Sequence, residues 1–191
     1  FYQGERMTVD EVVRRVMKLG APRVELTGGE PLLQPAVYPL MEALLARGLT
    51  VMLETSGAID VREVPAAVQK IVDLKTPSSG ESDRNDLGVL ESMNGNDELK
   101  FVLGTREDYE WAKGMLAQHK LSERPYPLLF SPMHGKLPAQ TLAEWQAFEE
   151  RLSRLPRFEP HVVRLKRLYV SLAVDSPARA FGEWLAARAD D

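Results

Sequence analysis

Short apolar segments recur along this chain, and segments with helical spacing separate them. We expect strands, about 20 to 30 residues apart, at Arg23–Leu26, Thr50–Leu53, Lys70–Leu74, Leu99–Leu103 and Leu128–Phe130. Alternation of this kind is typical of βα units and of a parallel sheet. Right-handed crossovers allow an open doubly wound sheet or a barrel-like one. Because no Gly-x-Gly-x-x-Gly follows a strand, we expect an α/β fold with a partial parallel β/α barrel.

Start and stop signals predict where the helices lie. Thr8 and Glu11 form a capping-box pattern before an apolar stripe that ends at Gly20. Further helices are expected at Val37–Leu45, ended by Gly48, at Arg106–Gln118 and at Leu142–Leu152, the last two with start signals at Thr105/Asp108 and Thr141/Glu144, and a shorter one at Asp60–Ala67, broken by Pro65. Residues 80–97 are expected to form a long loop with one helical turn at Asp86–Glu91.

Composition narrows the function classes. The 191 residues carry a formal net charge of −4, which gives no electrostatic footprint for a nucleic acid. No apolar run approaches the roughly 20 residues of a membrane span, and no signal peptide opens the chain, so we expect a cytoplasmic protein with no membrane partner. The sequence has no cysteine, which excludes a disulfide, a thiol nucleophile and a cysteine-held metal or iron–sulfur site within these residues.

Four loops are the candidate functional segments, because the carboxyl ends of parallel strands share one edge of the sheet. They are Thr27–Pro31, Glu54–Gly57, Lys75–Gly80 and Ser131–Gly135. Their small residues, hydroxyls and isolated charges suit a polar ligand that lies close to the backbone. Residues 1–150 are expected to form this body, and residues 151–191 a C-terminal tail of uncertain structure packed on the same domain.

Each loop also has a plainer interpretation. Gly28 and Gly29 let the backbone turn sharply and approach a ligand, and their carbonyls with the Glu30 carboxylate can accept hydrogen bonds from an ammonium group. Glu30 can equally compensate the dipole of the following helix. Glu54–Gly57 can be a simple turn. Lys75 can be a surface lysine or a contact to a carboxylate or ribose.

The remaining polar and aromatic candidates favour structural roles. His134 lies in a loop after a strand, where acid–base work is possible, but a solvated or structurally bonded loop histidine is the simpler interpretation. Trp111, Trp145 and Trp184 lie at helical positions, so we expect them to be core or flanking aromatic residues rather than stacking platforms.

Taken together, the motifs resemble the radical S-adenosylmethionine enzymes, and most specifically the 7-carboxy-7-deazaguanine synthase family. The resemblance runs from about Phe1 to Trp145, and the segments that carry it, in order, are Glu25–Leu32, Leu53–Gly57, Asp73–Glu81, Glu98–Val102 and Phe130–Pro132. It implies a carbon–nitrogen lyase of 7-deazapurine and queuosine biosynthesis, which contracts the ring of 6-carboxy-5,6,7,8-tetrahydropterin to give 7-carboxy-7-deazaguanine. The implied cofactors are S-adenosylmethionine, a [4Fe–4S] cluster and Mg²⁺, and the implied partners are a pterin substrate, a flavodoxin-like reductant and a second copy of the chain.

The resemblance also implies roles for individual residues. Those expected to bind the cofactor are Gly29, Glu30, Ser56, Lys75, Pro77, Ser78 and Ser79, and those expected to bind the substrate are Thr27 and Gly28. No catalytic residue and no metal ligand is assigned in this sequence.

The sequence departs from the family pattern in two places. The family's Cys-x-x-x-Cys-x-x-Cys loop is absent, with the Thr beside it that binds Mg²⁺, and so is the Leu-Gln-x-His-Lys stretch near the C-terminus. Phe1–Met7 resembles the stretch just after the cysteine loop, so we expect that loop to precede these residues in the complete protein. Alternatives are a cysteine-free, non-catalytic relative that binds a nucleoside or a partner, another radical S-adenosylmethionine activating enzyme, and a barrel-type lyase with Lys75 as a Schiff-base amine.

Overall fold

Five parallel strands form one sheet. The computed structural model describes residues 4–153, so the tail expected at 151–191, with Trp184, lies outside the described residues apart from the end of the last helix. The strands pair in the order in which they occur along the chain: β1 (Arg23–Leu26), β2 (Thr50–Thr55), β3 (Gln69–Asp73), β4 (Glu98–Leu103) and β5 (Leu128–Pro132). The α/β class and the parallel sheet are confirmed.

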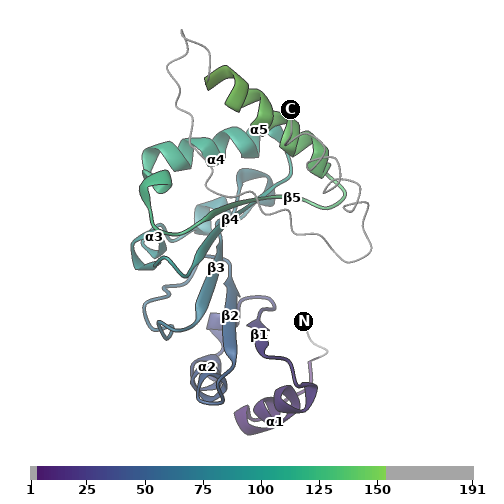
Figure 1. Cartoon of the computed structure of the whole chain (residues 1–191), viewed down its shortest axis with the longest axis vertical. Coiled ribbons are helices and arrows are strands. Elements are labelled where there is room, and N and C mark those ends of the chain that lie inside the picture. Colours follow the sequence, from purple (N-terminus) through teal and green to yellow (C-terminus); the bar gives the residue numbers. More distant parts are fainter. Residues whose placement is uncertain (1–3, 154–191) are drawn as a thin grey trace, which may run out of the picture.

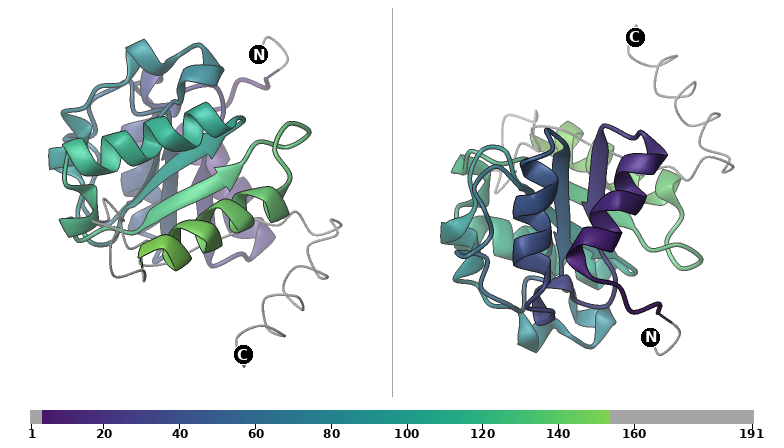
Figure 2. Two further views of the ribbon diagram at one scale, coloured as in Figure 1. Left: turned by 90° about the horizontal axis from the view of Figure 1, so that it is seen from above. Right: turned by 90° about the horizontal axis from the view of Figure 1, so that it is seen from below.

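The helices lie around the outer side of this curved sheet. They are α1 (Val9–Leu19), α2 (Val37–Leu45), α3 (Val89–Ser92), α4 (Arg106–Gln118) and α5 (Ala139–Ser153), joined by the short 3₁₀ helices η1 (Pro31–Leu33), η2 (Pro77–Ser79), η3 (Ser82–Arg84) and η4 (Leu121–Glu123). Figure 1 shows α1 and α2 beyond the β1–β2 end of the sheet and α4 and α5 beyond the β4–β5 end. Both views in Figure 2 show helices packed across the strands on this side. Helices on one side of a curved parallel sheet form a partial barrel.

The core lies between the sheet and these helices. Along β4, buried Leu99, Phe101 and Leu103 alternate with half-buried residues, so one face of the strand points into the core. The Phe101 ring contacts those of Phe130 and Trp111 edge-on, with centroids 5.5 Å and 6.4 Å apart. Full burial of side chains of this size stabilises the fold by about 1.5–3 kcal/mol each.

The predicted capping signals are confirmed, and one predicted helix is wrong. Thr8 and Thr105 both complete capping boxes at the starts of α1 and α4. Residues 60–67 form two consecutive turns in place of a helix. The N–H of Val64 donates to the carbonyl of Val61 in the first turn, and the N–H of Val68 donates to the carbonyl of Pro65 in the second. Asp60 accepts the N–H of Arg62, which favours a turn over a helix in this segment.

Other boundaries differ by a few residues. The helical turn expected at Asp86–Glu91 is found at Val89–Ser92, because the Asp86 carboxylate accepts the N–H of Gly88 and makes a turn first. Helix α5 begins at Ala139, before the expected start signal at Thr141, whereas α2 spans Val37–Leu45 as expected. Shifts of this size are common at helix ends.

A buried ion pair closes the amino-terminal edge of the sheet. Lys70 Nζ lies 2.9 Å from Oδ2 of Asp97, and the two side chains are 3% and 0% exposed. Asp97 also accepts the N–H groups of Lys70 and Asn94, at 2.9 Å and 2.8 Å. One carboxylate therefore attaches the end of the long loop, residues 80–97, to β3.

Candidate functional site

The predicted site loops follow β1, β2, β3 and β5, and all of them therefore lie at the carboxyl edge of the parallel sheet. Thr27, Gly28 and Gly29 are exposed there. Gly28 has a φ of +141°, which side-chain-bearing residues rarely adopt, and a Cβ at this position would meet nothing within 4 Å. The loop after β1 therefore presents its backbone to open space at this edge.

The Glu30 carboxylate connects the loop after β1 to the end of β2. Its Oε1 accepts the N–H of Leu32 at 3.1 Å and the hydroxyl of Thr55 at 2.9 Å. Its Oε2 accepts the N–H and the hydroxyl of Ser56, at 2.8 Å and 2.6 Å. A carboxylate has about four acceptor positions, and four donors of the chain itself use them.

Glu30 and Ser56 thus lie together as predicted, but they bind each other directly. The Ser56 hydroxyl donates a hydrogen bond to Glu30 and keeps lone pairs that can accept from a ligand. The acceptors left for a ligand ammonium group are these lone pairs and the carbonyls of the exposed Gly28 and Gly29. Among these acceptors, Glu30 holds the Ser56 hydroxyl in place. The sequence indicated the two residues and not the bond between them.

The η2 turn after β3 is fixed by hydrogen bonds to β4 and α4. Ser78 donates its N–H to Oδ1 of Asp108 at 2.9 Å and its hydroxyl to Oδ2 at 2.5 Å. Ser79 donates its hydroxyl to the carbonyl of Thr76 at 2.6 Å, and buried Thr76 donates to the carbonyl of Val102 at 2.9 Å. Pro77, at the start of η2, is exposed. The predicted residues of this turn are therefore ordered by two residues, Thr76 and Asp108, that the sequence did not assign to the site.

Lys75 extends β3 toward the same edge. Asn85 accepts its N–H at 2.9 Å and donates to its carbonyl at 2.8 Å, which mimics the pairing of a further strand. Lys75 Nζ lies 2.7 Å from Oδ2 of Asp73. Within the described part of the chain, the buried Oδ1 of Asp73 has no hydrogen-bond partner. His134 lies exposed in the turn after β5, in agreement with a loop histidine.

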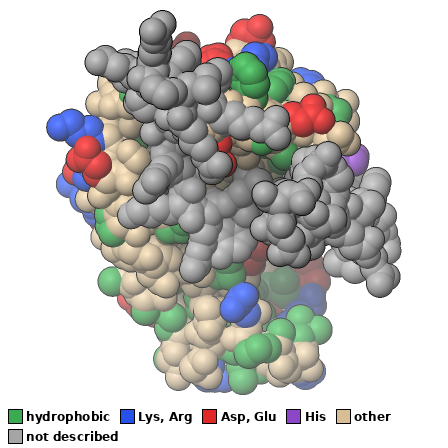
Figure 3. All heavy atoms as spheres, turned by 45° about the horizontal axis from the view of Figure 1, so that its top comes forward, with side chains coloured by type: hydrophobic (Ala, Val, Ile, Leu, Met, Phe, Trp, Pro, Cys, Tyr) green, Lys and Arg blue, Asp and Glu red, His purple; other side chains and the backbone are tan. Residues whose placement is uncertain are grey.

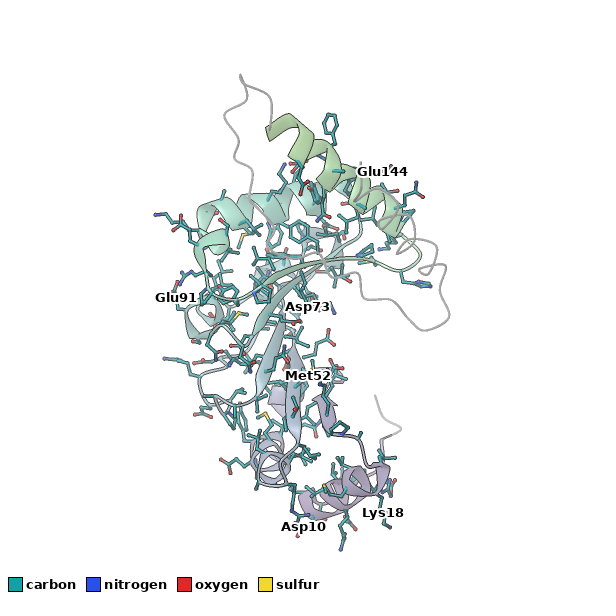
Figure 4. The ribbon with its side chains drawn as sticks, in the orientation of Figure 1. Asp10, Lys18, Met52, Asp73, Glu91 and Glu144 are labelled. Carbon is teal, nitrogen blue, oxygen red and sulfur yellow. The ribbon has the colours of Figure 1, made fainter. Side chains whose placement is uncertain are left out.

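The sheet face opposite the core carries charges. Glu54 of β2 and Lys100 of β4 form an ion pair of 2.6 Å, and each residue alternates with buried neighbours on its own strand. Asp73 and Met52 lie along the sheet, whereas Asp10, Glu91 and the other labelled charges lie on surrounding helices (Figure 4). We call Glu54–Lys100 and Asp73–Lys75 the inner-face ion pairs. These ion pairs were not predicted from the sequence. Charged residues at alternate positions of apolar strands are the signal that could have indicated them.

The described residues do not fit a metal centre. Within 4–153 no group of three His, Cys, Asp or Glu residues is placed to hold a metal ion. The whole sequence lacks the cysteines that hold iron–sulfur clusters.

Acidic and basic side chains are interspersed on the face shown in Figure 3. No helix among the described residues is long and apolar enough to cross a membrane.

Sequence comparison decides which proteins this chain resembles. It is 44% identical over 139 residues to a 7-carboxy-7-deazaguanine synthase of Koribacter versatilis, and this match covers 71% of the chain and 61% of the relative. A synthase of Chlorobaculum tepidum with the same name is 40% identical over 145 residues, covering 74% of the chain and 66% of the relative. The chain is a homologue of the 7-carboxy-7-deazaguanine synthases. No family model matches it.

Two further comparisons bear on the extent and the fold of this synthase homologue. A Methanospirillum hungatei 7-carboxy-7-deazaguanine synthase is 33% identical, with 55% of that relative covered, so the chain spans roughly 55–66% of the three relatives. The structure of Streptococcus suis SuiB bound to precursor peptide SuiA matches 78% of the chain and 39% of SuiB, with a TM-score of 0.53 and 12% identity. At that identity the likeness concerns the fold alone, and it supports the expected partial parallel β/α barrel.

Proposed function

We propose that this chain is the S-adenosylmethionine-binding body of a 7-carboxy-7-deazaguanine synthase. The observation that carries the proposal is the 44% identity to a synthase of that name over 139 residues. The complete enzyme would be a carbon–nitrogen lyase that contracts the ring of 6-carboxy-5,6,7,8-tetrahydropterin. Its flavodoxin-like reductant and its homodimeric state stay predictions of the resemblance, and its cytoplasmic location stays a prediction from composition.

The carboxyl edge of the sheet suits the methionine end of S-adenosylmethionine. The carbonyls of Gly28 and Gly29 and the lone pairs of Ser56 would accept hydrogen bonds from its ammonium group, and Glu30 would hold them in register through its bond to Ser56. The turn Pro77–Ser79 would line the other side of the cofactor. Bound there, S-adenosylmethionine supplies the 5′-deoxyadenosyl group of the reaction.

The inner face of the sheet suits a polar substrate. The inner-face ion pairs, Glu54–Lys100 and Asp73–Lys75, place charged donors and acceptors below the cofactor loops. A carboxylated pterin has a carboxylate for a lysine and ring N–H groups for a carboxylate. Thr27 and Gly28, at the end of β1, would contact the substrate from the cofactor side.

The residues of this chain do not fit the [4Fe–4S] cluster or the Mg²⁺ that the family uses. Iron–sulfur clusters need thiolate ligands, and the sequence has no cysteine. We therefore assign neither group to these residues and expect their ligands outside them. This chain by itself would bind S-adenosylmethionine without cleaving it.

A titration followed by amide NMR tests the binding role. Added S-adenosylmethionine should shift the amide signals of Gly28, Gly29, Ser56 and Ser78, while ATP at the same concentrations should not. Under strong reductant the chain should release no 5′-deoxyadenosine. Shifts confined to another surface, or none at millimolar ligand, would contradict the proposed site.

A genetic test addresses the reaction. The natural gene that contains this sequence should restore queuosine to the tRNA of a bacterium that lacks its own 7-carboxy-7-deazaguanine synthase. Restoration supports the lyase assignment. Binding of S-adenosylmethionine without restoration would instead support a non-catalytic relative that binds a nucleoside.

A further inference from the structure

Asp108 is a fully buried carboxylate at the third position of α4, with an exposed fraction of 0%. Its Oδ2 accepts the N–H groups of Gly104 and Thr105, at 2.8 Å and 3.1 Å, and the hydroxyl of Ser78 at 2.5 Å. Its Oδ1 accepts the N–H of Ser78 at 2.9 Å. All four donors belong to loops that follow β3 and β4.

A helix cap accounts for only part of this arrangement. The capping box needs the contact between Asp108 and the N–H of Thr105. The two bonds from Ser78 come from 30 residues earlier in the sequence and are not part of the capping box at the start of α4. Burial alone would raise the pKa of Asp108, but the hydrogen bonds from Ser78, Gly104 and Thr105 outweigh it and lower the pKa. The carboxylate is therefore held in its charged form, which binds these donors most strongly.

The packing at Gly104 shows how closely this contact is fitted. A Cβ at position 104 would lie 3.0 Å from the Ser78 hydroxyl oxygen and 3.4 Å from Oδ2 of Asp108. The same Cβ would lie 3.4 Å from the end of the Met133 side chain, in the loop after β5. Exposed Ser78 thus lies with its hydroxyl against the end of β4 and the start of α4, where the Asp108 carboxylate binds it.

We propose that Asp108 is a positioning residue of the ligand site, which fixes Ser78 and the η2 turn in the place where they contact the ligand. The identity of the ligand as S-adenosylmethionine rests on the proposed function. Asp108 itself is buried and does not touch the ligand. In this arrangement Asp108 does for the loops after β3 and β4 what Glu30 does for those after β1 and β2.

Asp108→Asn and Thr105→Ala form a matched pair of variants for the test. Asn keeps the size of Asp but replaces one carboxylate oxygen with an NH₂ group that cannot accept, so at least one of the two bonds from Ser78 is lost. Thr105→Ala removes the hydroxyl that accepts the N–H of Asp108 and weakens the start of α4 without touching Ser78. Two readouts by NMR apply to both: hydrogen exchange of the Ser78 amide and affinity for S-adenosylmethionine.

We expect Asp108→Asn to speed exchange of the Ser78 amide and to weaken affinity for S-adenosylmethionine by about tenfold, while Thr105→Ala changes neither beyond about twofold. Unchanged exchange at Ser78, or faster exchange with unchanged affinity, would overturn the positioning role. Equal losses in both variants would reduce Asp108 to a helix cap. If the wild-type chain binds no S-adenosylmethionine, the proposed function fails, and exchange at Ser78 still decides whether Asp108 holds the turn.

Discussion

The Ser56 hydroxyl donates a hydrogen bond of 2.6 Å to Oε2 of Glu30, across a separation of 26 residues in the sequence. The two residues belong to loops that follow neighbouring strands. Because the donors that Glu30 binds belong to the chain itself, its removal should affect the stability of the protein as well as binding.

Glu30→Gln should lower the free energy of unfolding of the chain by about 1–3 kcal/mol. The new NH₂ group would face N–H and O–H donors, and it cannot accept their hydrogen bonds. Urea denaturation measures this loss. Glu25→Gln, at an exposed position of β1, is the matched control and should stay within about 0.5 kcal/mol of the wild type. If Glu30 acts only by touching the ligand, the two variants will unfold alike.

Two glycine substitutions test how tightly the η2 turn is packed. Gly104→Ala should destabilise the chain by about 1–3 kcal/mol, since its Cβ would lie 3.0 Å from the Ser78 hydroxyl oxygen. Gly114→Ala, in the interior of α4 with nothing within 4 Å of the added Cβ, should stabilise it by about 0.5–1 kcal/mol. Thermal unfolding of the two variants side by side gives the signs. A stabilising Gly104→Ala would show that Ser78 is free to move.

The sequence predicted features that depend on local patterns. The short apolar segment Leu99–Leu103 identified β4, and the Thr8 and Thr105 capping boxes identified the starts of α1 and α4, because these signals lie within a few residues of one another. The gathering of the site loops followed from parallel topology alone. The Asp60–Ala67 prediction was wrong because a single Asx turn outweighed weak helical spacing.

The bonds inside the site were beyond the reach of sequence patterns. Asp108 matches a capping box, and nothing in its neighbourhood indicates that Ser78, 30 residues earlier, donates twice to it. The bond between Glu30 and Ser56 likewise depends on side-chain positions across two strands. Pairs of side chains that lie this far apart in the sequence can be identified only once the folded structure is known.

Lys70→Met should be among the most destabilising substitutions in the described part of the chain. It leaves Asp97 charged and 0% exposed, and breaking a buried pair in this way costs about 3–5 kcal/mol. Lys18→Met, on the exposed surface of α1, is the control and should cost less than about 0.5 kcal/mol. Urea denaturation compares them. A loss below about 1 kcal/mol for Lys70→Met would show that water reaches Asp97.

The contribution of Asp108 to stability should depend on pH. Because its pKa in the folded chain is lowered from the ordinary value of 3.8, the charged form stabilises the fold above that value, and the stabilisation is lost as the pH falls through the folded pKa. The difference in unfolding free energy between the wild type and Asp108→Asn should therefore be largest near neutral pH, at about 1–3 kcal/mol, and shrink in acid. Urea denaturation at several pH values between about 2 and 7 measures it, and taking the difference cancels the carboxylates common to both proteins. A difference that stays constant over this range would show that the charge of Asp108 contributes nothing to the bonds it accepts from Ser78.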